Sequence, residues 1–127
     1  MKVYRVQHER IKMGPYTAYR NATADEHGRL YDLSTLLRDA YYDDKDRWPE
    51  PYSDGMRVGF EEGAVFGFQS IGQLKEWFRP WLRLLRENDF VVAVFRDVQL
   101  LDEGSKQLAF RMQEPERVFD ISELLAA

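Results

Sequence analysis

Apolar and polar residues alternate at the start of the chain and merge into apolar runs further along it. Residues 1–8 read M-K-V-Y-R-V-Q-H, a two-residue period of good strand formers that predicts a β-strand. Its two faces would carry Lys2, Tyr4, Val6 and His8 on one side and Val3, Arg5 and Gln7 on the other. Residues 90–98, F-V-V-A-V-F-R-D-V, are apolar at nearly every position, which is typical of a central strand covered on both faces.

Three further segments are predicted as strands. Residues 63–69, G-A-V-F-G-F-Q, indicate a short buried strand in which Gly67 permits close approach of another chain segment. Residues 106–112 alternate and would pair with the 90–98 strand, after a turn at 102–105. Residues 118–121 suggest a last short strand.

The helical pattern predicts three helices and a short helical end. Apolar residues at 30, 33, 36, 37, 40 and 41 predict a helix over 30–42, capped by Asp32 or Ser34. The S-x-x-Q capping box at 70–73 opens a second, amphipathic helix, and Pro80 suits the first turn of a third helix over 81–87. A short helical end is expected at 122–125, whereas 17–28 and 43–54 are polar and are predicted as loops, the latter exposed.

This order of elements predicts a compact α+β fold with a mixed or antiparallel sheet and two or three helices. The length of 127 residues favours one domain over 1–127 with a hydrophobic core of its own.

Composition removes several classes of function. The chain has no cysteine, so a thiol nucleophile, a disulfide framework and a Cys-based zinc site are excluded. Its two histidines are nineteen residues apart, and the acidic residues near 43–46 lack the glycine and distal glutamate of a calcium loop, so we expect no metal. No apolar run is long enough for a membrane span, and we expect a cytoplasmic protein.

Charge is unevenly distributed along the chain. The formal net charge is −4, from 18 basic and 22 acidic residues, which argues against direct binding to nucleic acid. Residues 1–20 nevertheless carry five basic groups and one acid, whereas residues 39–62 carry eight acids and three basic groups. The basic segment forms an anion-binding face, or it pairs with the acidic segment and neutralises it.

The acidic segment also contains aromatic residues. Asp43, Asp44 and Asp46 precede Trp48 and Tyr52 in a proline-containing stretch. Exposed aromatic side chains framed by carboxylates favour a protein-contact surface. The alternative is that this loop folds back and buries its aromatic residues.

Three short segments resemble the blocks of the ADP-ribosyltransferase superfamily. They are V-Y-R-V-x-H at 3–8, G-A-V-F-G-F-Q-S-I-G-Q-L-K-E-W-F at 63–78 and S-K-Q-L-A-F-R at 105–111. The resemblance implies an ADP-ribosyltransferase-like fold and NAD as the cofactor. It assigns nucleotide binding to Arg5 or His8, the nicotinamide-flanking role to Phe66 and Phe68, and support of the first strand to Ser70. The chain is also similar to small phage-type proteins with Y-R-V near the start and F-G-F-x-S in the middle.

The catalytic position of that family departs from its pattern here. Gln107 stands where a glutamate is expected, and a glutamine can neither act as a base nor stabilise a developing positive charge. Glu103 is the nearest acidic alternative, but it precedes the strand. The resemblance therefore implies an NAD-type nucleotide pocket that is degenerate or active as a transferase towards a host protein. The competing hypothesis is a non-enzymatic acidic inhibitor that binds a nucleic-acid-binding protein through residues 39–62.

Overall fold

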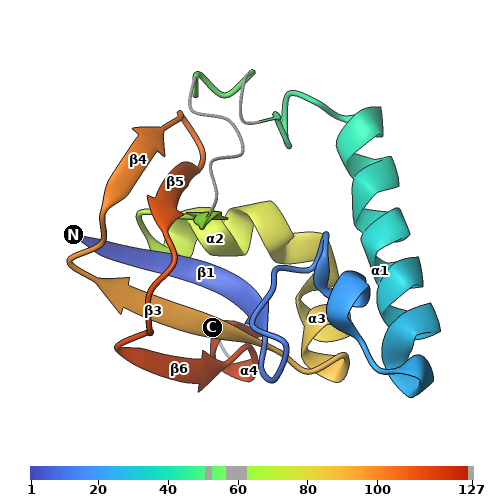
Figure 1. The fold of residues 1–127 in the computed structure, drawn as a ribbon. Helices are drawn as coiled ribbons and strands as arrows, with labels where there is room; N and C mark the ends of the chain where they lie inside the picture. The colour runs from blue at the N-terminus through green and yellow to red at the C-terminus, as the bar shows by residue number, and fades with distance from the viewer. Residues whose placement is uncertain (51–52, 57–62, 126–127) are drawn as a thin grey trace.

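The computed structural model describes residues 1–50, 53–56 and 63–125 and has a mixed α+β fold (Figure 1). Two small antiparallel sheets are combined with three main α-helices. The strands are β1 (Lys2–His8), β2 (Ala64–Gly67), β3 (Phe90–Arg96), β4 (Leu100–Glu103), β5 (Leu108–Arg111) and β6 (Arg117–Asp120). The α-helices are α1 (Ala24–Asp43), α2 (Ile71–Phe78), α3 (Leu82–Glu87) and the single-turn α4 (Ser122–Leu125). Two 3₁₀ turns, η1 (Ala18–Asn21) and η2 (Arg79–Trp81), precede α1 and α3.

The first sheet has the order β1-β3-β6, so the most apolar strand lies in the middle as predicted. β1 runs antiparallel to β3 over its whole length, from the pair Lys2–Arg96 to the pair His8–Phe90. The side chains from Val92 to Phe95 are fully buried, because this sheet is covered on both faces.

The second sheet has the order β2-β5-β4. The predicted pairing of the 106–112 strand with the 90–98 strand is therefore wrong. A tight hairpin intervenes, in which the Gly104 amide donates to the Gln107 carbonyl at 2.8 Å, and β5 pairs with β4 on one side and β2 on the other. β4 itself was not expected, since its last residues were predicted as a turn.

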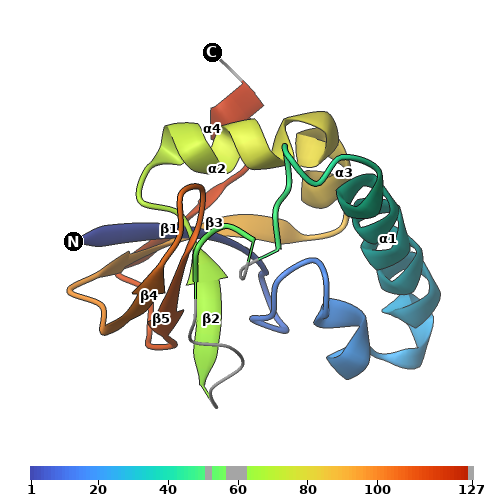
Figure 2. The ribbon, with the colours of Figure 1, turned by 90° about the horizontal axis from the view of Figure 1, so that it is seen from above.

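The two sheets meet where Tyr4 and Phe68 exchange backbone hydrogen bonds of 2.8 Å in both directions. Figure 2 shows the resulting layers: α2, α3 and α4 cover one face of the first sheet, and the second sheet lies on the opposite side. The larger hydrophobic cluster fills the helix side, and a smaller one fills the space between the sheets. This smaller cluster consists of Val3, Ala93, Phe95, Leu108 and Phe110.

Helix α1 begins six residues earlier than predicted. Its N-cap is Thr23, and the acidic Asp25 and Glu26 in its first turn interact favourably with the helix dipole. Ser34, predicted as a cap, lies inside the helix and donates its hydroxyl to the Tyr16 carbonyl at 2.7 Å. Residues 17–28 are polar and end in a glycine, which predicts a loop, but the structure places η1 and the start of α1 there.

The start of α2 agrees with the capping box, since the Ser70 hydroxyl accepts the Gln73 amide at 3.1 Å. Pro80 lies in η2, directly ahead of α3, as its restricted backbone favours. Among the described residues, no helix combines the length and apolarity needed to cross a bilayer.

Candidate functional site

Arg5 is a buried cation on the middle of β1. Its side chain is 9% exposed, Nη1 donates to the Phe66 carbonyl at 2.9 Å, and the guanidinium lies beside Gly14. Within the described part of the chain, no carboxylate forms an ion pair with it and its Nε has no hydrogen-bond partner. Burial lowers the pKa of Arg5 to about 10, so the side chain stays charged at neutral pH.

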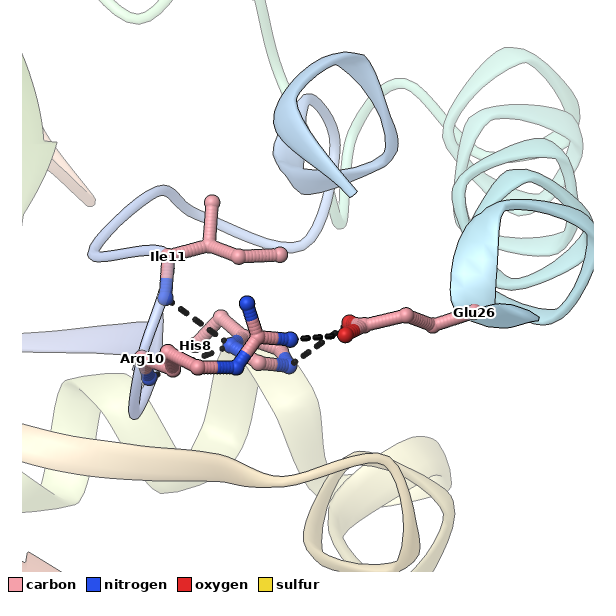
Figure 3. Close-up of polar contacts among 4 residues, drawn as sticks. All are labelled: His8, Arg10, Ile11 and Glu26. Carbon is pink, nitrogen blue, oxygen red and sulfur yellow. Dashed lines mark hydrogen bonds and ion pairs between the residues drawn. The ribbon is translucent and has the colours of Figure 1, made fainter. Parts of the chain in front are cut away.

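His8 ends β1 and is almost fully buried. Its Nδ1 accepts the backbone amides of Arg10 at 3.2 Å and Ile11 at 3.1 Å, as Figure 3 shows. The ring packs edge-on against Phe90, with 5.3 Å between centroids. Burial, followed by the nearby Arg10 charge, lowers the pKa of His8 below its ordinary value of 6.5.

Glu26, from the first turn of α1, reaches the same place. Its Oε1 accepts the guanidinium of Arg10, and its Oε2 lies 3.8 Å from His8 Nε2 (Figure 3). The Glu26 side chain is only 12% exposed. The sequence did not indicate Glu26 as a partner of His8, because the 17–28 segment was predicted as a loop and not as the beginning of a helix next to β1.

Phe66, Phe68 and Ser70 follow one another along the chain but lie in different surroundings. Phe68 is buried against the Trp77 and Phe78 rings, and Phe66 is half-buried in β2. Ser70 is exposed and lines an open hollow of about 410 Å³ together with Met1, Lys2, Gln69 and Gln73. Arg5 and His8 do not line this hollow.

Glu103 and Gln107 belong to the hairpin between β4 and β5. Both line a second, smaller hollow that shares Gln69 and Gln73 with the first. Glu103 accepts the Gln69 side-chain amide at 2.6 Å, and Gln107 donates through Nε2 to the Pro49 carbonyl at 3.1 Å. The structure thus brings Ser70, Glu103 and Gln107 to neighbouring hollows but leaves Arg5 and His8 outside both.

The segment after α1 does not behave as the exposed loop that its prolines and acids predict. Trp48 is buried, tilts against Trp81 with 4.9 Å between ring centroids, and donates Nε1 to the Trp77 carbonyl at 2.8 Å. The alternative in which the loop buries its aromatic residues therefore holds for Trp48. Tyr52 lies outside the described residues, and Asp43, Asp44 and Asp46 are exposed.

Asp54 is a buried carboxylate in this segment that the sequence pattern did not single out. It is 5% exposed, and its carboxylate accepts the backbone amides of Lys106 and Gln107 at 2.9 to 3.0 Å. The Lys106 ammonium donates in turn to the backbone carbonyls of Asp46 and Arg47. Because these partners are more than 50 residues apart, no local pattern could have revealed the clamp.

The outward side of α1 carries aspartates at helical spacing. The exposed aspartates of the helix are Asp25, Asp32, Asp39 and Asp43. Their spacing of seven, seven and four residues places them on one face, opposite the buried Leu30, Leu33 and Leu37. Leu36 is 47% exposed on that face, and α1 lies at the outer edge of the molecule in Figures 1 and 2. The spacing is visible in the sequence once the helix is known to begin at Ala24.

A protein-family model described as Bacteriophage T4 Y00F protein matches residues 1–123. The chain belongs to this phage protein family. The expected similarity to small phage-type proteins is thereby confirmed, whereas the match gives no support to ADP-ribosyltransferase ancestry. No curated protein and no solved structure matches the chain.

Proposed function

We propose that the protein is a non-enzymatic binding protein that docks onto the basic surface of a nucleic-acid-binding host protein. The docking surface is the acidic face, defined as Asp25, Asp32, Leu36, Asp39 and Asp43 of α1 with Asp44 and Asp46 of the following turn. The observation that carries the proposal is the alignment of these exposed carboxylates along one helix at the edge of the molecule.

The dimensions of the acidic face suit an extended basic groove. At a rise of about 1.5 Å per residue, the eighteen steps from Asp25 to Asp43 span about 27 Å. Carboxylates outnumber the exposed Arg29 and Lys45 on this surface, and a net negative row on this scale matches a groove that accepts a phosphate backbone. Charge complementarity of this kind increases the association rate and selects the partner.

Apolar side chains within and beside the carboxylates supply contact area. Leu36 lies between Asp32 and Asp39 in helical position, while Tyr31 and Tyr42 are 48% and 64% exposed next to the acidic face. Exposed tyrosines are enriched among residues that dominate binding energy. The surface therefore combines carboxylates that attract a basic partner with side chains that can be buried when the complex forms.

The sequence placed the contact surface within residues 39–62, whereas the proposed surface lies on α1 and the turn that follows it. Asp43, Asp44 and Asp46 remain part of it, but Trp48 belongs to the core and the helix contributes the carboxylates that precede residue 43. A rigid helix holds these charges in fixed register, which an exposed loop would not.

The test compares two variants with the same net charge. One neutralises the acidic face with Asp32→Asn, Asp39→Asn, Asp43→Asn and Asp46→Asn. The control neutralises exposed acids elsewhere with Glu87→Gln, Asp97→Asn, Glu114→Gln and Glu123→Gln. Each set changes the formal net charge from −4 to 0, so a difference between them reports position and not total charge.

The wild-type protein is immobilised and exposed to a nuclease-treated bacterial lysate, and each captured protein is purified and titrated by calorimetry. We expect a nucleic-acid-binding partner whose complex is dissociated by duplex DNA and weakened by salt. We expect its Kd to rise about tenfold or more with the acidic-face variant and to stay within about threefold with the control. Equal binding by both variants, or a complex indifferent to DNA, contradicts the proposal.

A second candidate is the NAD-type nucleotide pocket implied by the ADP-ribosyltransferase resemblance. The Arg5 guanidinium is the feature that favours it, because a cation whose Nε has no partner among the described residues suits a diphosphate, although Arg5 lines neither hollow. Thermal melting with millimolar NAD distinguishes the two functions. The nucleotide function requires a rise in Tm that disappears in Arg5→Met, whereas the docking function requires none.

A further inference from the structure

The turn that follows β1 is built around the imidazole of His8. Besides the two amides that Nδ1 accepts, the His8 amide donates to the Met13 carbonyl at 2.8 Å and the Lys12 amide donates to the His8 carbonyl at 2.9 Å. Lys12 adopts a φ of +67°, a left-handed conformation that a lysine holds only when its surroundings fix it. The side chain of His8 therefore acts as an internal cap of this turn.

The hydrogen bonds determine where the imidazole carries its proton. An Nδ1 that accepts two N–H groups has no hydrogen, so the neutral ring carries its proton on Nε2. Nε2 faces Glu26 Oε2 at 3.8 Å, and neither atom has a hydrogen-bond partner among the described residues. Protonation of the ring would place a hydrogen on Nδ1 against two backbone donors and would break both hydrogen bonds.

The same turn is attached to the beginning of α1. Arg10 lies in the turn, and its guanidinium pairs with Glu26 in the first turn of the helix (Figure 3). If the backbone at Arg10 and Ile11 is released from the imidazole, the anchor of the Arg10 side chain moves with it. The hydrogen bonds from the turn to His8 and the ion pair from Arg10 to Glu26 therefore together join the end of β1 to the first turn of α1.

The charges around His8 act in both directions. Glu9, Asp89 and Glu26 favour the protonated ring, whereas Arg10 and Arg29 oppose it. Burial against the edge of Phe90 is the largest influence and also opposes protonation. The surroundings of the closed turn therefore favour the neutral ring over the protonated one.

We propose that neutral His8 is a pH-sensitive latch that holds the first turn of α1 against the end of β1. When His8 takes up a proton, the 8–13 turn opens and the N-terminal end of α1 is released. The latch does not depend on the acidic face having a partner, so the two proposals can fail separately.

The test follows the backbone amides of Arg10 and Ile11 by NMR hydrogen exchange between pH 7.5 and 5.5, corrected for intrinsic rates. Below pH 6.5 we expect their protection to fall, because the opened ring binds a proton more readily than the closed ring. His8→Asn keeps an acceptor oxygen near the Nδ1 position and does not titrate, so its protection should be independent of pH. The matched control His27→Asn should keep the wild-type fall.

Imidazole ¹⁵N shifts of the wild-type protein provide a readout that needs no variant to fold. We expect His8 as the Nε2–H tautomer with a pKa below 6.5. An Nδ1–H tautomer, a His8 pKa at or above 6.5, or wild-type protection that does not change with pH would each overturn the latch.

Discussion

Gly67 shows how closely two strands approach one another at the junction of the sheets. A Cβ added there would lie 2.7 Å from Val3 Cγ1 and 3.0 Å from both Phe110 Cε1 and the Tyr4 carbonyl oxygen. Real Cβ atoms do not come so close, so β2 can reach β1 only through a glycine.

Gly67→Ala is therefore expected to lower the free energy of unfolding by about 1–3 kcal/mol, the usual cost of overpacking. Gly28 in α1 is the matched control, because its added Cβ would meet no atom within 4 Å. Gly28→Ala should raise stability by about 0.5–1 kcal/mol through helix propensity. Urea denaturation of both variants measures the difference, and a neutral Gly67→Ala would contradict the close approach.

Trp48 joins the segment after α1 to the helical layer. Trp48→Phe keeps most of the apolar contact with Trp81 but leaves the Trp77 carbonyl without its donor, at a cost of about 1–3 kcal/mol. Tyr42→Phe, at an exposed position, should change stability by less than about 0.5 kcal/mol. Chemical denaturation in parallel distinguishes a buried Trp48 from an exposed one, since an exposed Trp48 would give two equal midpoints.

Roles that depend on neighbours in the chain could be predicted from the sequence, and roles that depend on distant partners could not. The Ser70 cap and the close approach at Gly67 follow from local patterns and are confirmed. The Gln107 side chain is held by a hydrogen bond to the Pro49 carbonyl, 58 residues away in the chain. The Trp48 side chain is held by a hydrogen bond to the Trp77 carbonyl, 29 residues away. The sequence around Gln107 or Trp48 indicates neither of these partners.

At the scale of elements, the β4–β5 hairpin and the segment around Asp54 form one clamp. The Asp54 carboxylate accepts amides from Lys106 and Gln107, and its backbone carbonyl accepts the Ser105 amide at 2.9 Å. A Cβ on Gly104 would lie only 2.8 Å from the Asp54 carbonyl oxygen, so the hairpin tip fits closely around this residue.

Asp54→Ala should release this clamp. We expect hydrogen exchange at Lys106 and Gln107 to accelerate by about tenfold or more, because both amides lose their buried acceptor. Exchange in β1 should change much less, because β1 pairs with β3 along its whole length and makes no hydrogen bond to the hairpin or to Asp54 among the described residues. Glu114→Ala, at an exposed acid, is the control. Unchanged exchange at Lys106 and Gln107 would contradict the clamp.

Element interiors were predictable because burial repeats with the period of the element. The α2 face carries that period clearly, whereas the strand at 90–98 was recognised from a continuous apolar run that is buried on both faces. The start of α1 lacks it, since most of its first six residues are exposed, and no residue of the short β4 is fully buried. The partners of β5 depended on that missed strand.

At the scale of the whole molecule, stability should depend on pH through His8. Because folding lowers the pKa of His8 below 6.5, the unfolded chain binds a proton first as pH falls. Stability is therefore complete above about pH 6.5 and declines below it until the pKa of folded His8 is reached. Asp120, with a pKa lowered to about 2 chiefly by the Ser122 amide, keeps its contribution throughout that window.

Urea midpoints at pH 7.5 and 5.5 measure this decline. We expect the midpoint to fall in the wild-type protein and in His27→Asn, and to remain constant in His8→Asn. A wild-type midpoint that rises on acidification would show that folding favours the protonated ring.

The division into two sheets could not be predicted from the sequence pattern, because the pattern identifies strands but not which strands pair. The α+β class could be predicted from the order of elements. The site at the end of β1 could be predicted only as far as His8, because Glu26 arrives from a helix that the pattern did not show.

The pairing of β1 with β3 has a consequence for synthesis on the ribosome. Lys2 pairs with Arg96 and His8 pairs with Phe90, so more than 80 further residues must be synthesised after β1 before its partner strand β3 exists. Until then Val3 and Val6 stay exposed, because the first sheet cannot form without β3. Folding of the first sheet is thus deferred until β3 has been made, and a nascent chain halted before residue 90 should bind chaperones and be degraded readily by proteases.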